Sequence, residues 1–197
     1  GADAPRGPRP RVLVCTNYVF AKYVDLPPIE AERLFAPWAR SIPDFEDYWG
    51  AIHTHRENRG RIFEFLAPLL ATGKYDVTLR PHPAEESTFY EAGIAALPEA
   101  QRAFITLEPA RNITELILGC DVEISMDTCT TALESWLASK PTIDLDMRHH
   151  PMLTNEIVRP LNVHCTDPAT LPDLVAEALA RPDQPEVAVA RRAHLDK

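Results

Sequence analysis

Short apolar runs rich in β-branched residues recur along the chain, with amphipathic or polar stretches between them. The run at 11–16 is typical of a buried strand, because Val12, Leu13 and Val14 follow one another without a polar residue. The same criterion predicts strands at 11–16, 75–80, 103–107, 121–125, 141–145 and 162–165. Predicted helices cover 28–36, 84–95, 112–118 with Asn112 as cap, 129–139, and a stretch from Asp167 or Thr170 to about 180. Mixed spacings of three and four over 44–72 predict one or two amphipathic helices interrupted near Gly60.

From residue 74 onward, strands and helices alternate at intervals of about 20 residues. This alternation predicts an α/β fold, a Rossmann-like doubly wound parallel sheet with helices on both faces. Pro-rich residues 1–10 are typical of a linker or disordered lead-in, 11–181 form the main domain, and 182–197 form a helical tail.

Composition narrows the classes of protein without identifying one. Apolar residues make up 45% and charged residues 25%, as in an ordinary soluble globular domain. Basic residues number 20 against 29 acidic ones, so a net charge of −9 argues against nucleic acid as a partner but leaves room for a local phosphate pocket. No apolar window approaches the ~18 residues of a membrane span. The four cysteines form no C-x-x-C pair, which favours reduced thiols over a zinc site or a disulfide framework.

Ligands of doubly wound sheets bind outside the carboxyl ends of the strands, so the residues that follow each strand are the informative ones. The segment from Asp127 to Thr131 follows the predicted fourth strand and opens a helix. Hydroxyl groups, free backbone amides and the helix dipole there favour a phosphate. Glu134, farther along the same helix, is placed to accept hydrogen bonds from ribose hydroxyls. The alternative is an ordinary helix capped by Asp127 or Thr128.

A second candidate follows the predicted second strand, where the sequence is Arg80-Pro-His-Pro83. The two prolines hold the backbone extended and fix the place of His82, which can donate to a phosphate or act as acid or base. Arg80 adds a guanidinium fork suited to phosphate. The alternative is a polar turn with a histidine in solvent. Because both segments end at the same sheet edge, they favour one shared site.

Weaker candidates each have a structural alternative that we prefer. His53 and His55 form a metal pair or a solvated helix face, and His149 and His150 border the cleft or lie in an ordinary loop. Asp144 and Asp146 are paired carboxylates or a polar strand end, and Glu85 and Glu86 are functional or serve the helix dipole. Cys129 is a nucleophile or a small buried residue. The chain contains no G-x-G-x-x-G and no G-K-[ST], which excludes the common dinucleotide and P-loop motifs.

Taken in order, Arg80-Pro-His-Pro, the run from Asn112 to Ser125, Thr128-Cys-Thr-Thr-Ala-Leu-Glu-Ser and Lys140-Pro-Thr-Ile resemble the C-terminal, donor-binding half of GT-B glycosyltransferases. The resemblance is to bacterial surface-carbohydrate proteins that make capsule and lipopolysaccharide, and it covers about 11–180. Val12-Leu-Val-Cys-Thr-Asn17 is similar to the strand and turn that open that half.

The resemblance implies a nucleotide-sugar-binding domain that transfers a sugar from a CMP-activated acidic donor to a glycan acceptor. Nucleotide and phosphate contacts would come from Asn17, Arg80, His82, Asp127, Thr128, Cys129, Thr130, Thr131 and Glu134, with His82 also the candidate catalytic group. No cofactor and no metal are expected beyond the donor itself, and a second Rossmann domain would supply the acceptor side. The implied location is the cytoplasm, at the inner face of the membrane where such glycans are built.

Three alternatives to this function stay open. One is a phosphotransferase for CDP-activated polyols, which uses a similar pair of motifs. Another is a non-catalytic nucleotide-binding module of a larger assembly. The last is a UDP-hexosamine 2-epimerase, which the resemblance disfavours because Cys129 and Thr130 stand where the epimerase turn has two glycines.

Overall fold

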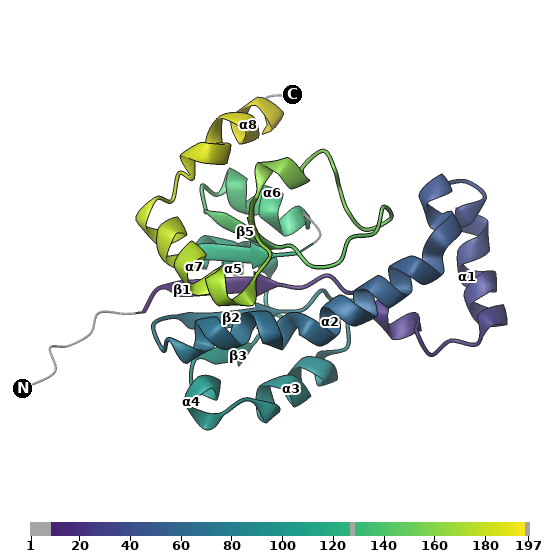
Figure 1. Cartoon of the computed structure of the whole chain (residues 1–197), viewed down its shortest axis with the longest axis horizontal. Helices are drawn as coiled ribbons and strands as arrows, with labels where there is room; N and C mark the ends of the chain where they lie inside the picture. Colours follow the sequence, from purple (N-terminus) through teal and green to yellow (C-terminus); the bar gives the residue numbers. More distant parts are fainter. Residues whose placement is uncertain (1–8, 127–128, 196–197) are drawn as a thin grey trace, which may run out of the picture.

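Six parallel strands form one sheet in the computed structural model, which describes residues 9–126 and 129–195. They are β1 (Arg11–Cys15), β2 (Asp76–Arg80), β3 (Ile105–Leu107), β4 (Val122–Ser125), β5 (Thr142–Leu145) and β6 (Val163–Cys165). The strand order is β3-β2-β1-β4-β5-β6, which is the order of dinucleotide-binding Rossmann folds. The predicted α/β class with an all-parallel, Rossmann-like sheet is therefore confirmed (Figure 1).

Helices pack around this sheet on both sides. The α-helices are α1 (Pro28–Ala39), α2 (Tyr48–Ala71), α3 (Ser87–Ala96), α4 (Glu99–Arg102), α5 (Ile113–Gly119), α6 (Thr130–Leu137), α7 (Leu171–Ala180) and α8 (Pro185–Leu195). Short 3₁₀ helices are η1 (Ala21–Tyr23), η2 (Pro43–Asp47), η3 (Arg159–Leu161) and η4 (Pro168–Thr170). Among the described helices, none has the length and apolar character needed to cross a bilayer.

Alternation along β1 divides the interior into two layers. Val12 and Val14 face the main core, whereas Leu13 and Cys15 face the other side and pack on α5. Both sets are buried, as expected for a central parallel strand covered on each face. The main core is closed by α2 and α7, and its helical members include Ile62, Phe65, Leu66, Leu69, Leu171 and Val175.

A helical arm stands off the carboxyl edge of the sheet (Figure 1). It comprises η1, α1, η2 and the first turn of α2, and we use the name arm for residues 21–52. The arm has a small apolar core of its own, in which Phe35 stacks on Tyr48 at 5.1 Å between ring centroids. The C-terminal part of α2 then runs from the arm onto the main core.

The predicted interruption near Gly60 is wrong, because α2 is continuous from Tyr48 to Ala71. Gly60 lies on the exposed side of α2, where a Cβ would meet no atom within 4 Å. The apolar residues that follow are buried on the opposite side, and their burial outweighs a helix penalty of about 1 kcal/mol for glycine.

The start of one helix and the presence of another also differ from the sequence prediction. The helix expected from residue 84 begins at Ser87, because a turn closed by the Glu85 amide and the His82 carbonyl (2.8 Å) comes first. The helical turn α4 lies just before β3 and is not predicted. The predicted cap is confirmed, since the Asn112 side chain accepts from the Thr114 amide at 2.9 Å.

The tail helix α8 is fixed to the sheet by one buried arginine. Arg191 donates to the Leu161 carbonyl (2.7 Å), to Gln184 Oε1 (2.6 Å) and to Thr142 Oγ1 (2.9 Å). Burial lowers the pKa of its guanidinium to about 10, which leaves the group charged at neutral pH. Charge-assisted hydrogen bonds of this kind are about twice as strong as neutral ones, so α8 is held against β5 rather than merely resting on it.

Candidate functional site

The strand order reverses direction between β1 and β4, and this is the position where open α/β sheets bind ligands. Val14 pairs with Leu79 on one side and with Ile124 on the other, so β1 lies between β2 and β4. The turns after these three strands therefore share one edge. That edge carries the predicted residues after Cys15, after Leu79 and after Ser125, and it faces the arm (Figure 1).

The turn after β2 is bonded directly to the turn after β1. The backbone N–H of His82 donates to the Thr16 carbonyl (3.1 Å), and the Thr16 N–H donates to the Arg80 carbonyl (3.1 Å). These bonds extend the β1–β2 pairing beyond the last strand residues. The predicted neighbours Thr16, Asn17 and His82 are thus brought together, with Asn17 partly buried and His82 exposed.

The structure specifies which ring nitrogen of His82 carries the proton. The Ala84 backbone N–H donates to Nδ1 of His82 at 3.1 Å, and an amide can only donate. Nδ1 must therefore be the unprotonated acceptor, which leaves the proton of the neutral ring on Nε2. The exposed His82 side chain presents an Nε2–H donor at the sheet edge, and such a donor suits a phosphate or carboxylate oxygen.

Arg80 is placed differently from a free phosphate fork. Its side chain is buried, and Nε donates to the Arg111 carbonyl at 3.3 Å while Nη1 donates to the Pro81 carbonyl. The guanidinium thus fixes the path of the Arg80–Pro83 turn and the loop before α5. Two of the five N–H donors of Arg80 are therefore directed to backbone carbonyls.

The segment after β4 begins α6 with Cys129 as N-cap and without a side-chain cap bond. Asp127 and Thr128, which are predicted phosphate contacts, lie outside the described residues. Thr130 is exposed at the first helical position, whereas Thr131 turns inward and donates to Glu123 Oε1 at 2.9 Å. Burial raises the pKa of the Cys129 thiol, in agreement with a packing role rather than a nucleophile.

Glu134 lies four residues after Thr130, on the same face of α6 and partly buried. This face of the helix therefore combines an exposed hydroxyl at the first turn with a carboxylate one turn later. A phosphate at the helix start and a ribose alongside would meet these two groups in that order. The roles expected for Thr130 and Glu134 stay predictions.

The predicted site omits Glu123, a fully buried carboxylate in β4. Burial, opposed in part by the Thr131 hydrogen bond, raises its pKa to about 8, so the group holds its proton at neutral pH. Glu123 anchors the first turn of α6 through Thr131. An acidic residue between Val122 and Ile124 in an apolar run is the sequence signal that could have indicated it.

Asp144 in β5 and Asp146 just after it are not an isolated acid pair. His164 Nδ1 lies 3.5 Å from Asp144 Oδ2 and 3.8 Å from Asp146 Oδ2, and the hydrogen bond with Asp144 raises the pKa of His164. Asp146 also contacts His149 and accepts from Arg159 at 2.7 Å. Acidic and basic groups thus neutralise one another here, as a polar strand end would require.

His53, His55 and His150 take part in packing and local hydrogen bonds. His55 is buried and accepts from the Phe20 amide at 3.2 Å, while His53 is exposed and stacked on Trp49. His150 is buried, accepts from the Met152 amide and lies 3.1 Å from Asp47 Oδ2. In the part of the chain that the structure describes, no group of three His, Cys, Asp or Glu side chains could hold a metal ion.

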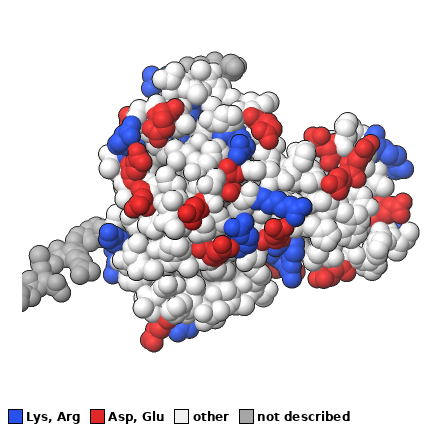
Figure 2. Space-filling view, in the orientation of Figure 1, with Lys and Arg blue, Asp and Glu red and all other residues white. Residues whose placement is uncertain are grey.

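Charge at this surface is local rather than general. On the face drawn in Figure 2, acidic and basic side chains are interspersed over the sheet domain, and acidic ones gather on the arm. This face therefore presents no broad positive field to an anion. Compared with known proteins, the chain matches no family model and no curated protein sequence.

Proposed function

We propose that this chain is the donor-binding half of a glycosyltransferase that uses a CMP-activated acidic sugar in surface polysaccharide synthesis. The observation that supports this most is the His82 turn. Its imidazole is held as an Nε2–H donor at the same sheet edge as the start of α6. A nucleotide phosphate between these two features would receive a side-chain donor and a helix N-terminus together.

The same two features suit the chemistry of sugar transfer. When the bond between the sugar and the phosphate breaks, negative charge develops on the leaving nucleotide. Fixed donors that face this charge lower the barrier, because they need no reorganisation during the reaction. His82 would stabilise the leaving phosphate, and Glu134 would hold the ribose. The glycan acceptor and a second Rossmann domain are part of this proposal.

Calorimetric titration of the chain with CMP, CDP and UDP tests the donor site. We expect cytidine-selective binding that weakens about tenfold in His82→Ala and in Glu134→Ala, the effect of one lost charge-assisted hydrogen bond. His53→Ala is the matched control, because His53 is an exposed histidine of α2 that stacks on Trp49. Nucleotide affinity and transfer that are both unchanged in His82→Ala would overturn the proposal.

Product analysis separates the proposed reaction from the other transferase. A glycosidic product from a CMP-sugar supports sugar transfer, whereas a phosphodiester product from a CDP-polyol means phosphotransfer at the same site. Interconversion of UDP-sugars without an acceptor would instead establish epimerisation. Nucleotide binding without turnover, also in the presence of a partner domain, would establish a binding module.

A further inference from the structure

Glu85 occupies the centre of the bonded turns at the sheet edge. Its Oε1 accepts from the Thr16 hydroxyl at 2.7 Å and from the His82 backbone N–H at 3.1 Å. Its Oε2 accepts from the hydroxyl of Tyr90, which is fully buried in α3. One carboxylate therefore joins the end of β1, the turn after β2 and the helix behind that turn.

These three donors explain how a negatively charged Glu85 fits at an edge that is proposed to bind an anion. Burial, with Glu85 as the second cause, raises the pKa of Tyr90 far above its ordinary value, which keeps that hydroxyl protonated as a donor. Three donors converge on the Glu85 carboxylate, whose oxygens therefore point into the turn. The negative charge of Glu85 is thus compensated by donors inside the turn. The His82 side chain, with its Nε2–H donor, remains exposed outside the turn.

The helix dipole does not explain this arrangement. Both Glu85 and Glu86 precede α3, which begins at Ser87, so the expectation that they form its first turn is wrong. Glu86 is the N-cap residue, makes no side-chain cap bond and lies 3.6 Å from the Arg59 guanidinium. Its neighbour Glu85 makes three side-chain hydrogen bonds to residues on other elements or in the turn.

We infer that Glu85 is a positioning residue of the anion site: it locks the His82 turn to the Thr16 turn so that the imidazole keeps one tautomer and one direction. Glu85 acts on a ligand through His82. Its carboxylate accepts from the His82 backbone N–H, and its own backbone N–H donates to the His82 carbonyl, which closes the turn. A fixed donor loses little entropy on binding, whereas a mobile imidazole must be ordered by the ligand. This inference rests on the proposed function for the identity of the ligand, but not for the lock itself.

Four variants of the full chain separate geometry from charge. Glu85→Gln retains a carbonyl oxygen for Thr16 and His82, while its amide can donate to the Tyr90 oxygen, so we expect behaviour close to the parent. Glu85→Ala removes the carboxylate that accepts all three bonds and leaves the His82 N–H with the Thr16 carbonyl alone, whereas Tyr90→Phe removes only the bond to α3. Glu86→Ala is the matched control for acidic charge at the start of α3.

The first measurement needs no ligand. Nitrogen-15 NMR of the imidazole reports the tautomer of His82, which we expect to be wholly Nε2–H in the parent, in Glu85→Gln and in Glu86→Ala. In Glu85→Ala we expect a tautomer mixture at His82, with the fold retained by circular dichroism. An unchanged His82 spectrum in Glu85→Ala would overturn the inference.

The second measurement is a double-mutant cycle on CMP binding. We expect Glu85→Ala to weaken CMP about tenfold in the parent, and to have no further effect in the His82→Ala background, because the two residues act as a unit. Full additivity would overturn the inference. If the parent binds none of CMP, CDP or UDP while Glu85→Ala still alters the His82 spectrum, the ligand assignment fails and the lock stands.

Discussion

Glu123 is an acidic side chain that is fully buried in the core. It lies in the central strand β4, where Leu13 of β1 and Thr142 of β5 are its neighbours in register. Desolvation disfavours the carboxylate form, and the Thr131 hydroxyl offsets only part of this penalty. The neutral acid is therefore the form that the fold accommodates, and it holds the first turn of α6 in place.

The pKa of Glu123 predicts the direction of a pH effect on stability. Its pKa rises from 4.5 to about 8 on folding, so the folded state binds this proton more tightly than the unfolded state. The stabilisation is fully present below about pH 4.5 and is lost as the pH rises toward 8. We expect Glu123→Gln, which cannot ionise, to unfold with a free energy less dependent on pH in this window than the parent.

Urea unfolding at pH 5, 6.5 and 8 measures this difference. The variant should gain relative to the parent as the pH increases. Glu32→Gln, a change at an exposed residue of α1, should leave the pH dependence of the parent unchanged. Parallel pH profiles for Glu123→Gln and the parent would contradict the assignment of the raised pKa.

At the scale of elements, α2 illustrates how packing overrides local propensity. Glycine and proline inside a helix both disfavour it, and α2 contains Gly60 and Pro68. The helix nevertheless spans 24 residues, because one side covers the arm and then the main core. Helical stability in proteins comes mainly from such packing, so a local breaker is tolerated where its neighbours are buried.

Two glycines at helical positions predict opposite effects of the same substitution. Gly60→Ala adds a methyl into open space on α2 and should stabilise the chain by about 0.5–1 kcal/mol. Gly93→Ala places its methyl against the Phe63 ring and should destabilise by about 1–3 kcal/mol. Denaturant midpoints of the two variants check this, and equal signs for both changes would show that helix propensity alone decides.

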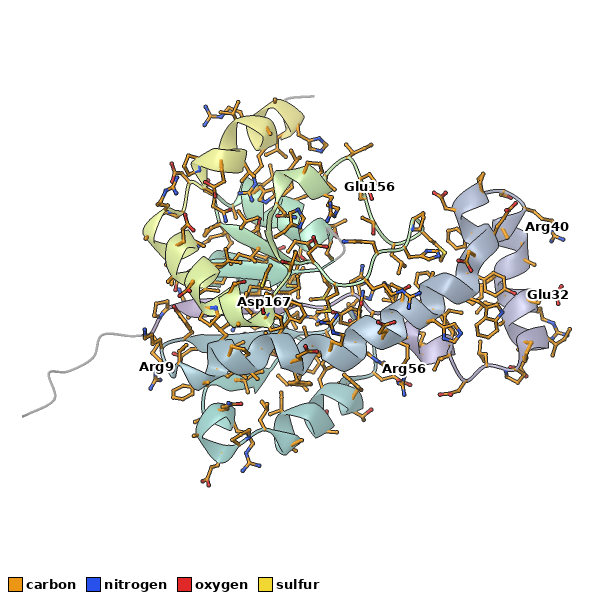
Figure 3. All side chains as sticks on the ribbon, in the orientation of Figure 1. Arg9, Glu32, Arg40, Arg56, Glu156 and Asp167 are labelled. Atoms are coloured by element: carbon orange, nitrogen blue, oxygen red, sulfur yellow. The ribbon has the colours of Figure 1, made fainter. Side chains whose placement is uncertain are left out.

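At the scale of the whole molecule, α2 and the arm are joined to the connection after β5 by contacts between residues 90 and 103 positions apart in sequence. Asn58 of α2 donates to the Arg148 carbonyl (2.8 Å) and accepts from the Arg148 amide (3.2 Å). His150 adds a contact with Asp47, and this partner lowers the pKa of Asp47. Glu32 and Arg40 lie on the outer part of the arm, and Glu156 lies on the connection between β5 and β6 (Figure 3).

The buried Asn58 side chain should therefore control how firmly that connection is held. Asn58→Ala leaves both backbone groups of Arg148 without this partner, and we expect a loss of about 1–3 kcal/mol. Amide hydrogen exchange in 147–158 should accelerate together with exchange in the arm. Glu57→Ala removes only the exposed ion pair with Arg148 and should change stability by less than about 1 kcal/mol. Equal exchange in Asn58→Ala and the parent would contradict this connection.

The local sequence determines most of the secondary structure, because its signals act within a few residues. The apolar run at Val12–Val14 is a strand, Asn112 caps α5, and the alternation after residue 74 yields a parallel sheet. The local sequence does not predict helix boundaries that depend on backbone hydrogen bonds or on burial. The delayed start of α3 follows from the turn between His82 and Glu85, and the unbroken α2 follows from burial beyond Gly60.

For the candidate site, too, some features follow from the sequence and others only from the tertiary structure. The sequence alone locates the candidate segments, because residues that follow parallel strands must share an edge. Only the tertiary structure decides what each side chain does there. Arg80 turns to backbone carbonyls, Thr131 turns inward to Glu123, and Glu85 binds three donors that lie 69, 3 and 5 residues away. Periodicity fixes which face a residue occupies, whereas the hydrogen-bond partners that folding brings to a side chain fix its direction, its protonation and its chemistry.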